Sequence, residues 1–214
     1  MASDTPPRIA AAILAGGRAR RMGGANKAGL QIGNERIIDR QLRLLRQIAD
    51  PVFVVAGSAE PFQELEITVV PDVVPGVGPL GGIYTALTAS PCARTLIVAC
   101  DLPYLTLPLL QSLAAPSDAD LVIPRTGRGY EPLCATWSAA CAGAIWRRIQ
   151  NGTLKTALVV EELRVEEIGP EVLASCDPHG LLFVNVNTPH ASPGRRLLDR
   201  ELDLIPWMDR HVYS

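Results

Sequence analysis

The sequence lacks the residue patterns that mark disulfide-rich, metal-clustered and membrane-spanning proteins. Its five cysteines are odd in number and no two of them have CxxC spacing, so neither a disulfide framework nor a zinc ribbon is predicted. The three histidines show no ligand spacing and form no triad with the cysteines. No apolar stretch is long enough to span a bilayer, and the run at 9–14 is too short for a signal peptide. We therefore expect a cytoplasmic protein with reduced thiols and no membrane partner.

A strong charge of one sign is also missing. Lysine and arginine number 20 against 22 acidic residues, which gives a net charge of −2. A broad basic face for nucleic acid requires a clear excess of cations, so no nucleic-acid partner is expected. Apolar residues make up 48% of the 214 positions, enough to bury a sizeable core. We expect a flexible leader at 1–8, one domain at 9–196 and a C-terminal tail at 197–214.

Short apolar runs alternate with amphipathic segments, most regularly in the first half of the chain. This alternation is typical of a three-layer, Rossmann-like α/β fold with a mostly parallel sheet. The expected strands are at 9–14, 52–55, 67–70, 95–99, 120–123, 131–137 and 181–186. The expected helices are at 35–49, 83–89, 105–114, 139–150 and 154–163.

The most informative stretch is LAGGRARRMGGANK at 14–27, which begins at the end of the first expected strand. Open α/β sheets bind ligands beyond the carboxyl ends of their strands. Glycines let backbone N–H groups approach phosphate oxygens closely, and Arg21 and Lys27 would add positive charge. A solvent-exposed turn with solvated basic residues is the alternative. The position after the first strand favours an anion-binding loop.

Two aspartates also follow expected strands. Asp101 directly follows the run TLIVAC. A carboxylate beside a phosphate-binding loop would repel the phosphate unless a cation lay between the two, and Mg²⁺ is suited to that position. The alternative for Asp101 is a helix N-cap before Leu102 and Pro103. Asp72 follows the run VVP and could reach a ribose, a metal or no ligand.

Two further patterns are weaker. Residues 76–81 match GxGxxG, with Asp101 about twenty residues further on as in a dinucleotide fingerprint. Prolines interrupt both the approach and the motif, so we discount a dinucleotide site. Asn185 and Asn187 flank Val186, and in a strand their side chains would point the same way, toward a ligand. A cap for a following helix is the alternative for this pair.

Taken together, the motifs resemble those of the molybdenum cofactor guanylyltransferases, over nearly the whole chain from 9 to 190. The wider group of nucleotidyltransferases shares LAGG followed by RMG and a lysine, and the combination of this motif with NVNTP points to this member. The matching segments are LAGG at 14–17 with RRMGG at 20–24 and Lys27, GPLGG at 78–82, VACDLP at 98–103 and FVNVNTP at 183–189. The resemblance implies a nucleotidyltransferase domain.

The resemblance also implies a role for each matched residue. Lys27, Arg21 and Asp101 would be catalytic, and Asp101 would also bind Mg²⁺. Asn185 and Asn187 would face the acceptor. Contacts to the nucleotide would come from Leu14, Ala15, Gly16, Gly17, Lys27, Asp72 and Asp101.

The implied reaction transfers GMP from GTP to molybdopterin and releases pyrophosphate, without a covalent enzyme intermediate. GTP, molybdopterin and Mg²⁺ are the implied ligands. Proteins that mature molybdoenzymes are further candidate partners, and we expect a monomer or a weak homo-oligomer.

Four features depart from the family's usual pattern, one of which is that the segment NTPHA at 187–191 lacks the acidic residues that commonly follow NTP. Asn26 stands where the family has an aspartate before the lysine, Ala56 where a polar residue often follows the second strand, and Gly81 where alanine is more usual. The alternatives are a relative that uses CTP or a sugar or alditol phosphate, and a nucleotide-binding relative without turnover. A dinucleotide oxidoreductase ranks third.

Overall fold

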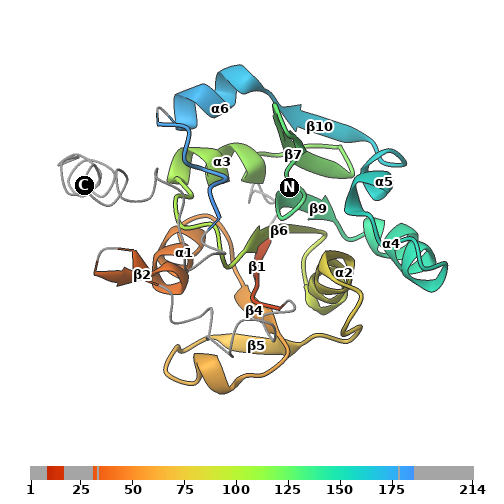
Figure 1. The fold of residues 1–214 in the computed structure, drawn as a ribbon, viewed down its shortest axis with the longest axis horizontal. Helices are drawn as coiled ribbons and strands as arrows, with labels where there is room; N and C mark the ends of the chain where they lie inside the picture. Colours follow the sequence, from red (N-terminus) through yellow and green to blue (C-terminus); the bar gives the residue numbers. More distant parts are fainter. Residues whose placement is uncertain (1–8, 17–30, 33, 178, 186–214) are drawn as a thin grey trace, which may run out of the picture.

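A mixed sheet forms the centre of the protein (Figure 1), in a computed structural model that describes residues 9–16, 31–32, 34–177 and 179–185. Among these residues, the strand pairs are parallel except those that β9 makes with its two neighbours, the β7–β8 hairpin and a small separate sheet. In order across the sheet, the strands are β10 (Val165–Ile168), β7 (Leu121–Thr126), β9 (Cys134–Ser138), β6 (Arg94–Ala99), β1 (Ala10–Leu14), β4 (Val52–Ala56) and β5 (Thr68–Pro71). The shorter elements are β8 (Gly129–Tyr130), the paired strands β2 (Gln31–Ile32) and β3 (Glu35–Arg36), and the 3-10 turn η3 (Glu60–Phe62).

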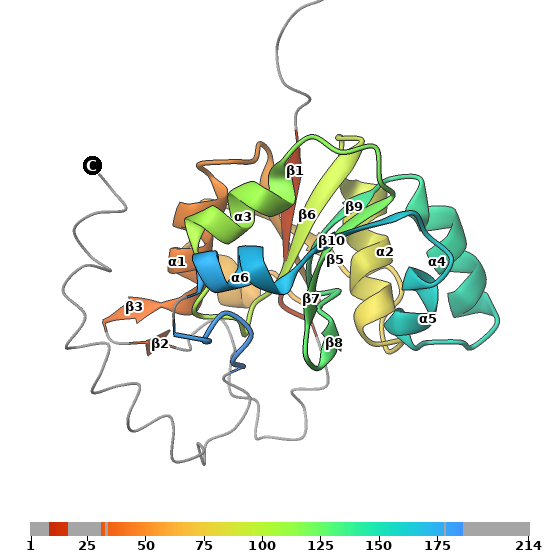
Figure 2. The same cartoon turned by 90° about the horizontal axis from the view of Figure 1, so that it is seen from above.

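Helices cover both faces of the sheet and give three layers (Figure 2). Successive side chains of the fully buried strand β1 enter the two cores in turn, which explains its continuous apolar run. No helix in the described part of the chain is long and apolar enough to cross a membrane. The expected three-layer α/β fold with a mostly parallel sheet is confirmed. On one face lie α1 (Ile37–Leu45), α3 (Leu107–Ala114) and α6 (Pro170–Cys176), and on the other α2 (Pro79–Ala89), α4 (Cys141–Gln150) and α5 (Thr156–Val160).

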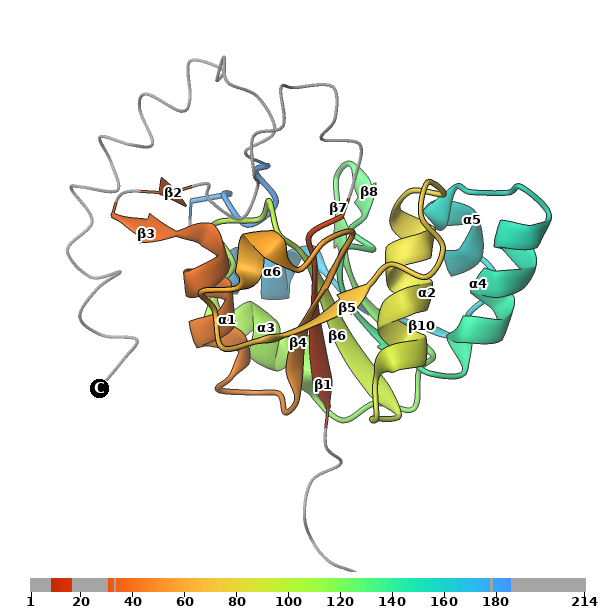
Figure 3. The ribbon, with the colours of Figure 1, turned by 90° about the horizontal axis from the view of Figure 1, so that it is seen from below.

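The order of the strands reverses beside β1. The chain runs outward from β1 through β4 to β5, and then returns by way of α2 to β6 on the other side of β1. In open α/β sheets, ligands bind outside the carboxyl ends of the strands at such a switch point. This edge of the sheet faces the top of Figure 3.

The prediction of a strand at 181–186 is wrong for residues 181–185, the part of this segment that the structure describes. Residues 181–185 form a turn and irregular chain, because the Asp177 carboxylate accepts hydrogen bonds from the N–H groups of Leu181 and Leu182 at 2.8 and 2.9 Å. The apolar character of this run reflects packing rather than sheet formation, since Leu182 is buried in the core.

Other boundaries differ from the sequence expectations for local reasons. The helix expected from 35 begins at Ile37, because the two residues before it pair with β2. The helix expected at 154–163 is limited to α5, and that expected at 83–89 begins earlier, at Pro79. The sequence pattern predicts neither β10 nor α6. β10 reads VEEI with two exposed glutamates, a composition that protects an edge strand from pairing with another chain.

The five cysteines are free thiols, as expected. Cys100, Cys134, Cys141 and Cys176 are buried, and Cys92 is half-buried. Burial raises the pKa of Cys141 to about 11 and also raises the pKa of Cys134. Because the thiolate is the reactive form, these two groups are poorly reactive in the folded protein.

We expect an aromatic disulfide reagent to modify Cys92 alone in the native protein and all five thiols after denaturation in guanidinium. The physical reason is access, which burial denies to the other four side chains. The absorbance of the released chromophore before and after denaturation gives the number of reactive thiols in the native and in the denatured protein. A Cys92→Ser variant that still reacts in the native state would contradict this assignment.

Candidate active site

The carboxyl ends of β1 and β6 bring two of the sequence motifs together. Leu14 and Ala99 are register partners, and the N–H of Cys100 donates a hydrogen bond to the Leu14 carbonyl at 3.1 Å. Asp101 comes next in the chain, so it lies at the same edge of the sheet as Gly16. A Cβ atom added at Gly16 would meet no other described atom within 4 Å, which leaves its backbone open to a ligand. The LAGG and CDLP motifs therefore share one edge, at the switch point.

The predicted site is only partly covered by the described residues. Leu14 is buried, and the N–H of half-buried Ala15 donates a hydrogen bond to the Val55 carbonyl at 2.9 Å. The contacts that Leu14 and Ala15 are predicted to make to a nucleotide stay predictions. Outside the described residues lie Gly17, Arg21, Asn26, Lys27 and Asn187.

Gln41 of α1 holds the turn that carries Asp101, a role that sequence analysis did not predict. Its side chain is 1% exposed, and its Nε2 donates hydrogen bonds to the carbonyls of Ala99 and Leu102, both at 2.9 Å. These two carbonyls flank Asp101, so one amide fixes the chain on both sides of the carboxylate. A glutamine among the apolar residues of an amphipathic helix is the only sequence signal for this contact.

Asp101 is half-buried and does not cap a helix. α3 begins at Leu107 with Thr106 as its N-cap residue, so the helix-cap alternative is wrong. No cluster of three metal-ligating side chains occurs within the described ranges. Mg²⁺ generally takes one or two carboxylates and completes its shell with phosphate oxygens and water. If the predicted loop after Gly16 binds phosphate, the single carboxylate of Asp101 would fit Mg²⁺ that arrives with a nucleotide.

Asp72 fixes the loop that leads from β5 into α2. Its Oδ1 accepts hydrogen bonds from the hydroxyl of buried Thr85 at 2.9 Å and from the N–H of Val74 at 3.0 Å. The Thr85 hydroxyl in turn accepts a hydrogen bond from the N–H of Val73 at 3.1 Å. Asp72 thus positions this edge of the site through the loop, and its contact to a nucleotide stays a prediction.

The GPLGG motif forms the start of α2 in close contact with its surroundings. Gly78, just before the helix, has a φ of +76°. A Cβ on Gly81 would lie 2.6 Å from the Val74 carbonyl oxygen, and one on Gly82 would lie 3.2 Å from Cδ1 of Leu14. The loop after β5 therefore excludes the alanine that is more usual at position 81.

The strand order also decides against a dinucleotide site at residues 76–81. That motif follows β5, whereas Asp101 follows β6, and β1 and β4 lie between these two strands. Three strand spacings separate β5 from β6 by about 14 Å. The acid is therefore not on the strand next to the glycine motif, as a dinucleotide fingerprint requires.

Asn185 is exposed at the end of the described residues, in irregular chain. The segment before it is attached to the β7–β8 hairpin, because Nη2 of Arg128 donates a hydrogen bond to the Phe183 carbonyl at 3.2 Å. β7 runs in the same direction as β6, so this hairpin projects from the same edge of the sheet. The predicted acceptor residue is therefore held at the edge that also carries Asp101.

Two carboxylates stabilise this hairpin. The Tyr130 hydroxyl donates a short hydrogen bond to Glu167 of β10, which raises the pKa of Tyr130. Burial raises the pKa of Glu131, while Arg128, 3.7 Å away, and the Thr126 hydroxyl oppose that effect. Glu167 thus fixes the hairpin to β10, and Glu131 stabilises it from within.

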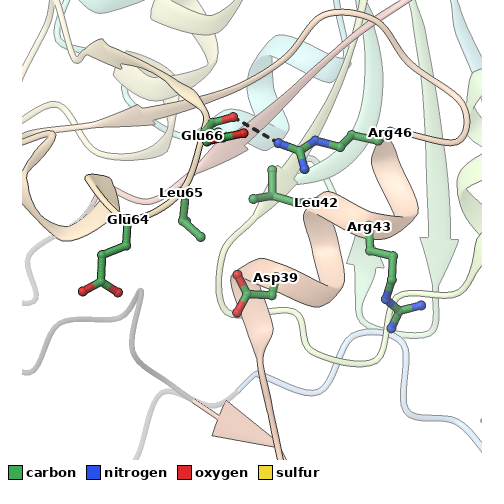
Figure 4. A pocket seen from close by; sticks show the side chains of 7 residues that line it. All are labelled: Asp39, Leu42, Arg43, Arg46, Glu64, Leu65 and Glu66. Carbon is green, nitrogen blue, oxygen red and sulfur yellow. Dashed lines mark hydrogen bonds between the residues drawn. The ribbon is translucent and has the colours of Figure 1, made fainter.

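A groove of about 500 Å³ lies elsewhere, between α1 and the segment before β5 (Figure 4). Several of its charged side chains have partners: Asp39 pairs with Arg36 at 2.5 Å, and Nη2 of Arg46 donates a hydrogen bond to the Glu66 carbonyl at 3.1 Å. None of the predicted site residues lines it. We therefore do not assign the activity to this groove.

Comparisons with known proteins give a matching family model, similar sequences and a similar fold. The model of a family described as the MobA-like NTP transferase domain matches residues 11–168. A probable molybdenum cofactor guanylyltransferase from Pelotomaculum thermopropionicum is 36% identical over 178 residues, which cover 83% of this chain and 86% of that protein. A molybdenum cofactor guanylyltransferase from Desulfosudis oleivorans is 32% identical, covering 82% of this chain and 88% of its own length. The structure of molybdopterin-guanine dinucleotide biosynthesis protein A from Archaeoglobus fulgidus superposes with a TM-score of 0.73 at 25% identity, covering 91% and 98% of the two chains.

We expect Gly81→Ala to lower the free energy of unfolding by about 1–3 kcal/mol, because the loop after β5 must shift to admit the methyl group. Gly143→Ala in α4 is the matched control, since its Cβ would meet nothing closer than 3.9 Å. That substitution should raise the free energy of unfolding by about 0.5–1 kcal/mol through helix propensity. Urea unfolding of both variants measures the difference, and equal stability would contradict the close contact at position 81.

We expect Gln41→Leu to lower the free energy of unfolding by about 1–3 kcal/mol, because two carbonyls beside Asp101 lose their donor. Thr136→Val is the control, since that buried hydroxyl has no hydrogen-bond partner among the described residues. The valine variant should be at least as stable as wild type and up to about 1–3 kcal/mol more stable, because it removes a buried hydroxyl that has no partner. The midpoints of guanidinium unfolding compare the two variants. A Gln41→Leu variant as stable as Thr136→Val would refute a stabilising role for the hydrogen bonds from Gln41.

Proposed function

The chain belongs to the family of MobA-like NTP transferase domains, and from that premise we propose that it transfers GMP from GTP to molybdopterin with release of pyrophosphate. The observation that carries the proposal is the meeting of the LAGG motif and Asp101 at the β1–β6 switch point. Parallel α/β sheets bind nucleotides at such points. The names of the relatives supply the nucleotide and the acceptor.

In this proposal the triphosphate lies along the glycine loop that starts at Gly16, where backbone N–H groups bind its oxygens. Lys27 and Arg21 neutralise the charge that builds up on the departing pyrophosphate. The turn held by Gln41 presents the Asp101 carboxylate beside that loop. Asp101 would hold Mg²⁺, which when bound neutralises charge on the α-phosphate.

The phosphate of molybdopterin attacks the α-phosphorus of GTP in line with the departing group. A bond forms between the acceptor oxygen and the α-phosphorus, the bond to the β-phosphate oxygen breaks, and pyrophosphate takes the electron pair. No covalent bond to the protein is required. The protein therefore accelerates the reaction by positioning the two phosphates and stabilising the developing charge.

We expect the purified protein to release one pyrophosphate per guanine dinucleotide formed when it is given GTP, Mg²⁺ and molybdopterin under exclusion of oxygen. Thermal shifts with GTP and with CTP compare the two bases, because stabilisation follows affinity. Nucleotide binding without pyrophosphate release would point to a relative without turnover, and a larger shift with CTP would overturn the choice of GTP.

The same assay tests the site. Lys27→Ala and Asp101→Ala should each lower turnover by about 10²-fold or more, because each removes a group that stabilises charge in the transition state. Asp118→Asn, at an exposed position before β7, is the control and should keep wild-type turnover. Circular dichroism checks that the variants are folded. Near-normal activity of either alanine variant would refute the site assignment.

A further inference from the structure

The β7–β8 hairpin carries two arginines at the edge of the sheet where the candidate site lies. Val122 of β7 pairs with Thr136 of β9, which pairs with Leu96 of β6. Counting on by three residues places Arg125 level with Ala99, the residue at the carboxyl end of β6. Two strand spacings, about 10 Å, separate these two backbone positions. The hairpin therefore borders the Asp101 turn on the side away from the LAGG motif (Figure 3).

Arg125 is exposed and held in place by a ring. Its guanidinium carbon lies 4.4 Å from the centroid of the Tyr130 ring, and the Tyr130 hydroxyl is bonded to Glu167 of β10. Stacking on a fixed ring limits the rotamers of an arginine, and a guanidinium has five N–H donors, more than a contact with one hydroxyl uses. No carboxylate of the described residues forms an ion pair with Arg125. Arg125 is therefore pre-positioned without an ion pair of its own in the described part of the chain, and the Glu167 carboxylate lies on the other side of the Tyr130 hydroxyl.

Arg125 lies on the face of the sheet that α2 covers. Side chains alternate along a strand, and Leu121 and Ile123 belong to the same core as the buried residues of α2. Arg125 continues this series beyond the core. Its guanidinium therefore faces the side on which the GPLGG start of α2 packs against Leu14.

Arg128 adds a second cation at the tip of the same hairpin. Its side chain is 73% exposed, and one of its nitrogens is bonded to the Phe183 carbonyl, two residues before Asn185. The tip is itself well defined, because the Thr126 hydroxyl accepts a hydrogen bond from the N–H of Arg128 at 3.2 Å and donates one to the Gly129 carbonyl at 3.1 Å. The hairpin thus links the predicted acceptor segment to a pair of arginines.

We propose that Arg125, assisted by Arg128, binds the phosphate monoester group of the acceptor substrate at this edge of the sheet. The inference rests on the proposed function, in which a dianionic phosphate must approach a triphosphate that carries charge of the same sign. A stacked guanidinium offers two parallel N–H donors to such a phosphate and lowers this repulsion. The nucleotide side of the site is served by Lys27 and Arg21 in the proposal above, so the hairpin arginines are assigned to the acceptor.

We expect Arg125→Gln to raise the KM for molybdopterin about 10- to 100-fold, the effect of losing a charge-assisted hydrogen bond pair. The KM for GTP should stay within twofold of wild type, and Arg128→Gln should act on the same constant in the same direction. Arg125→Lys keeps the charge without the paired donors and should give an intermediate KM. Steady-state kinetics with one substrate saturating separates the two constants.

Arg164→Gln is the matched control. Arg164 is 72% exposed and loses the same charge, but it lies before β10 at the opposite edge of the sheet. Its KM values for both substrates should equal those of wild type. An Arg125→Gln variant that matches this control, or one that raises the KM for GTP instead, would overturn the proposal.

A binding experiment tests the subsite without turnover. Equilibrium dialysis in the absence of GTP compares molybdopterin with its dephosphorylated form. Wild type should prefer the phosphorylated form by about tenfold or more, and Arg125→Gln should abolish that preference. If wild type shows no turnover but still binds the phosphorylated form more tightly, the proposed guanylyl transfer is refuted and the subsite remains supported. A preference that survives in Arg125→Gln would refute the subsite alone.

Discussion

The parallel pairing of β1 with β6 is the interaction on which the rest of the structure depends. It joins the first strand to one that arrives only after the chain has built β4, β5 and α2, and it ends with the hydrogen bond from Cys100 to Leu14. Because β1 is fully buried and β6 is buried from Thr95 onward, this register is fixed by packing on two faces of the sheet. Gly16 and Asp101 therefore follow the ends of neighbouring strands, and the proposed nucleotide would meet both at this edge.

Buried polar contacts from neighbouring helices define the edge further. Gln41 reaches from α1 to the two carbonyls around Asp101, and Thr85 reaches from α2 to Asp72. Both side chains come from the helices on opposite faces of the sheet, so the edge is held from both sides. Buried hydrogen bonds of this kind cost free energy when one partner is lost, and they therefore keep the loops in one geometry. Catalysis by positioning depends on such rigidity.

The antiparallel strand β9 gives the second half of the site a different construction. It follows β7 and β8 in the chain but lies antiparallel between β6 and β7 in the sheet, and the β7–β8 hairpin that leads into it projects at the edge that carries Gly16 and Asp101. The first half supplies backbone donors and a carboxylate, whereas the hairpin supplies arginines held by an aromatic ring and by the segment before Asn185. Two phosphate-bearing substrates would thus be bound by parts of the sheet with different chemistry.

The sequence by itself determined the strands of the first half, the layer architecture, the motifs at 14–17 and 98–103 and the free state of the cysteines. These properties follow from local patterns: short apolar runs, glycines after a strand, and cysteines without paired spacing. The tertiary structure decided what depends on partners distant in the chain. Gln41 donates hydrogen bonds to carbonyls about sixty residues away in the chain. The Asp72 carboxylate accepts hydrogen bonds that fix the loop after β5. Residues 181–185 form a turn held by the Asp177 carboxylate and do not join the sheet. The two exposed glutamates of β10 likewise give no strand pattern in the sequence, and the strand is defined only by its pairing with β7. Hydrogen-bond partners of this kind leave no periodicity in a sequence, because they are set by how the strands cross and not by local spacing.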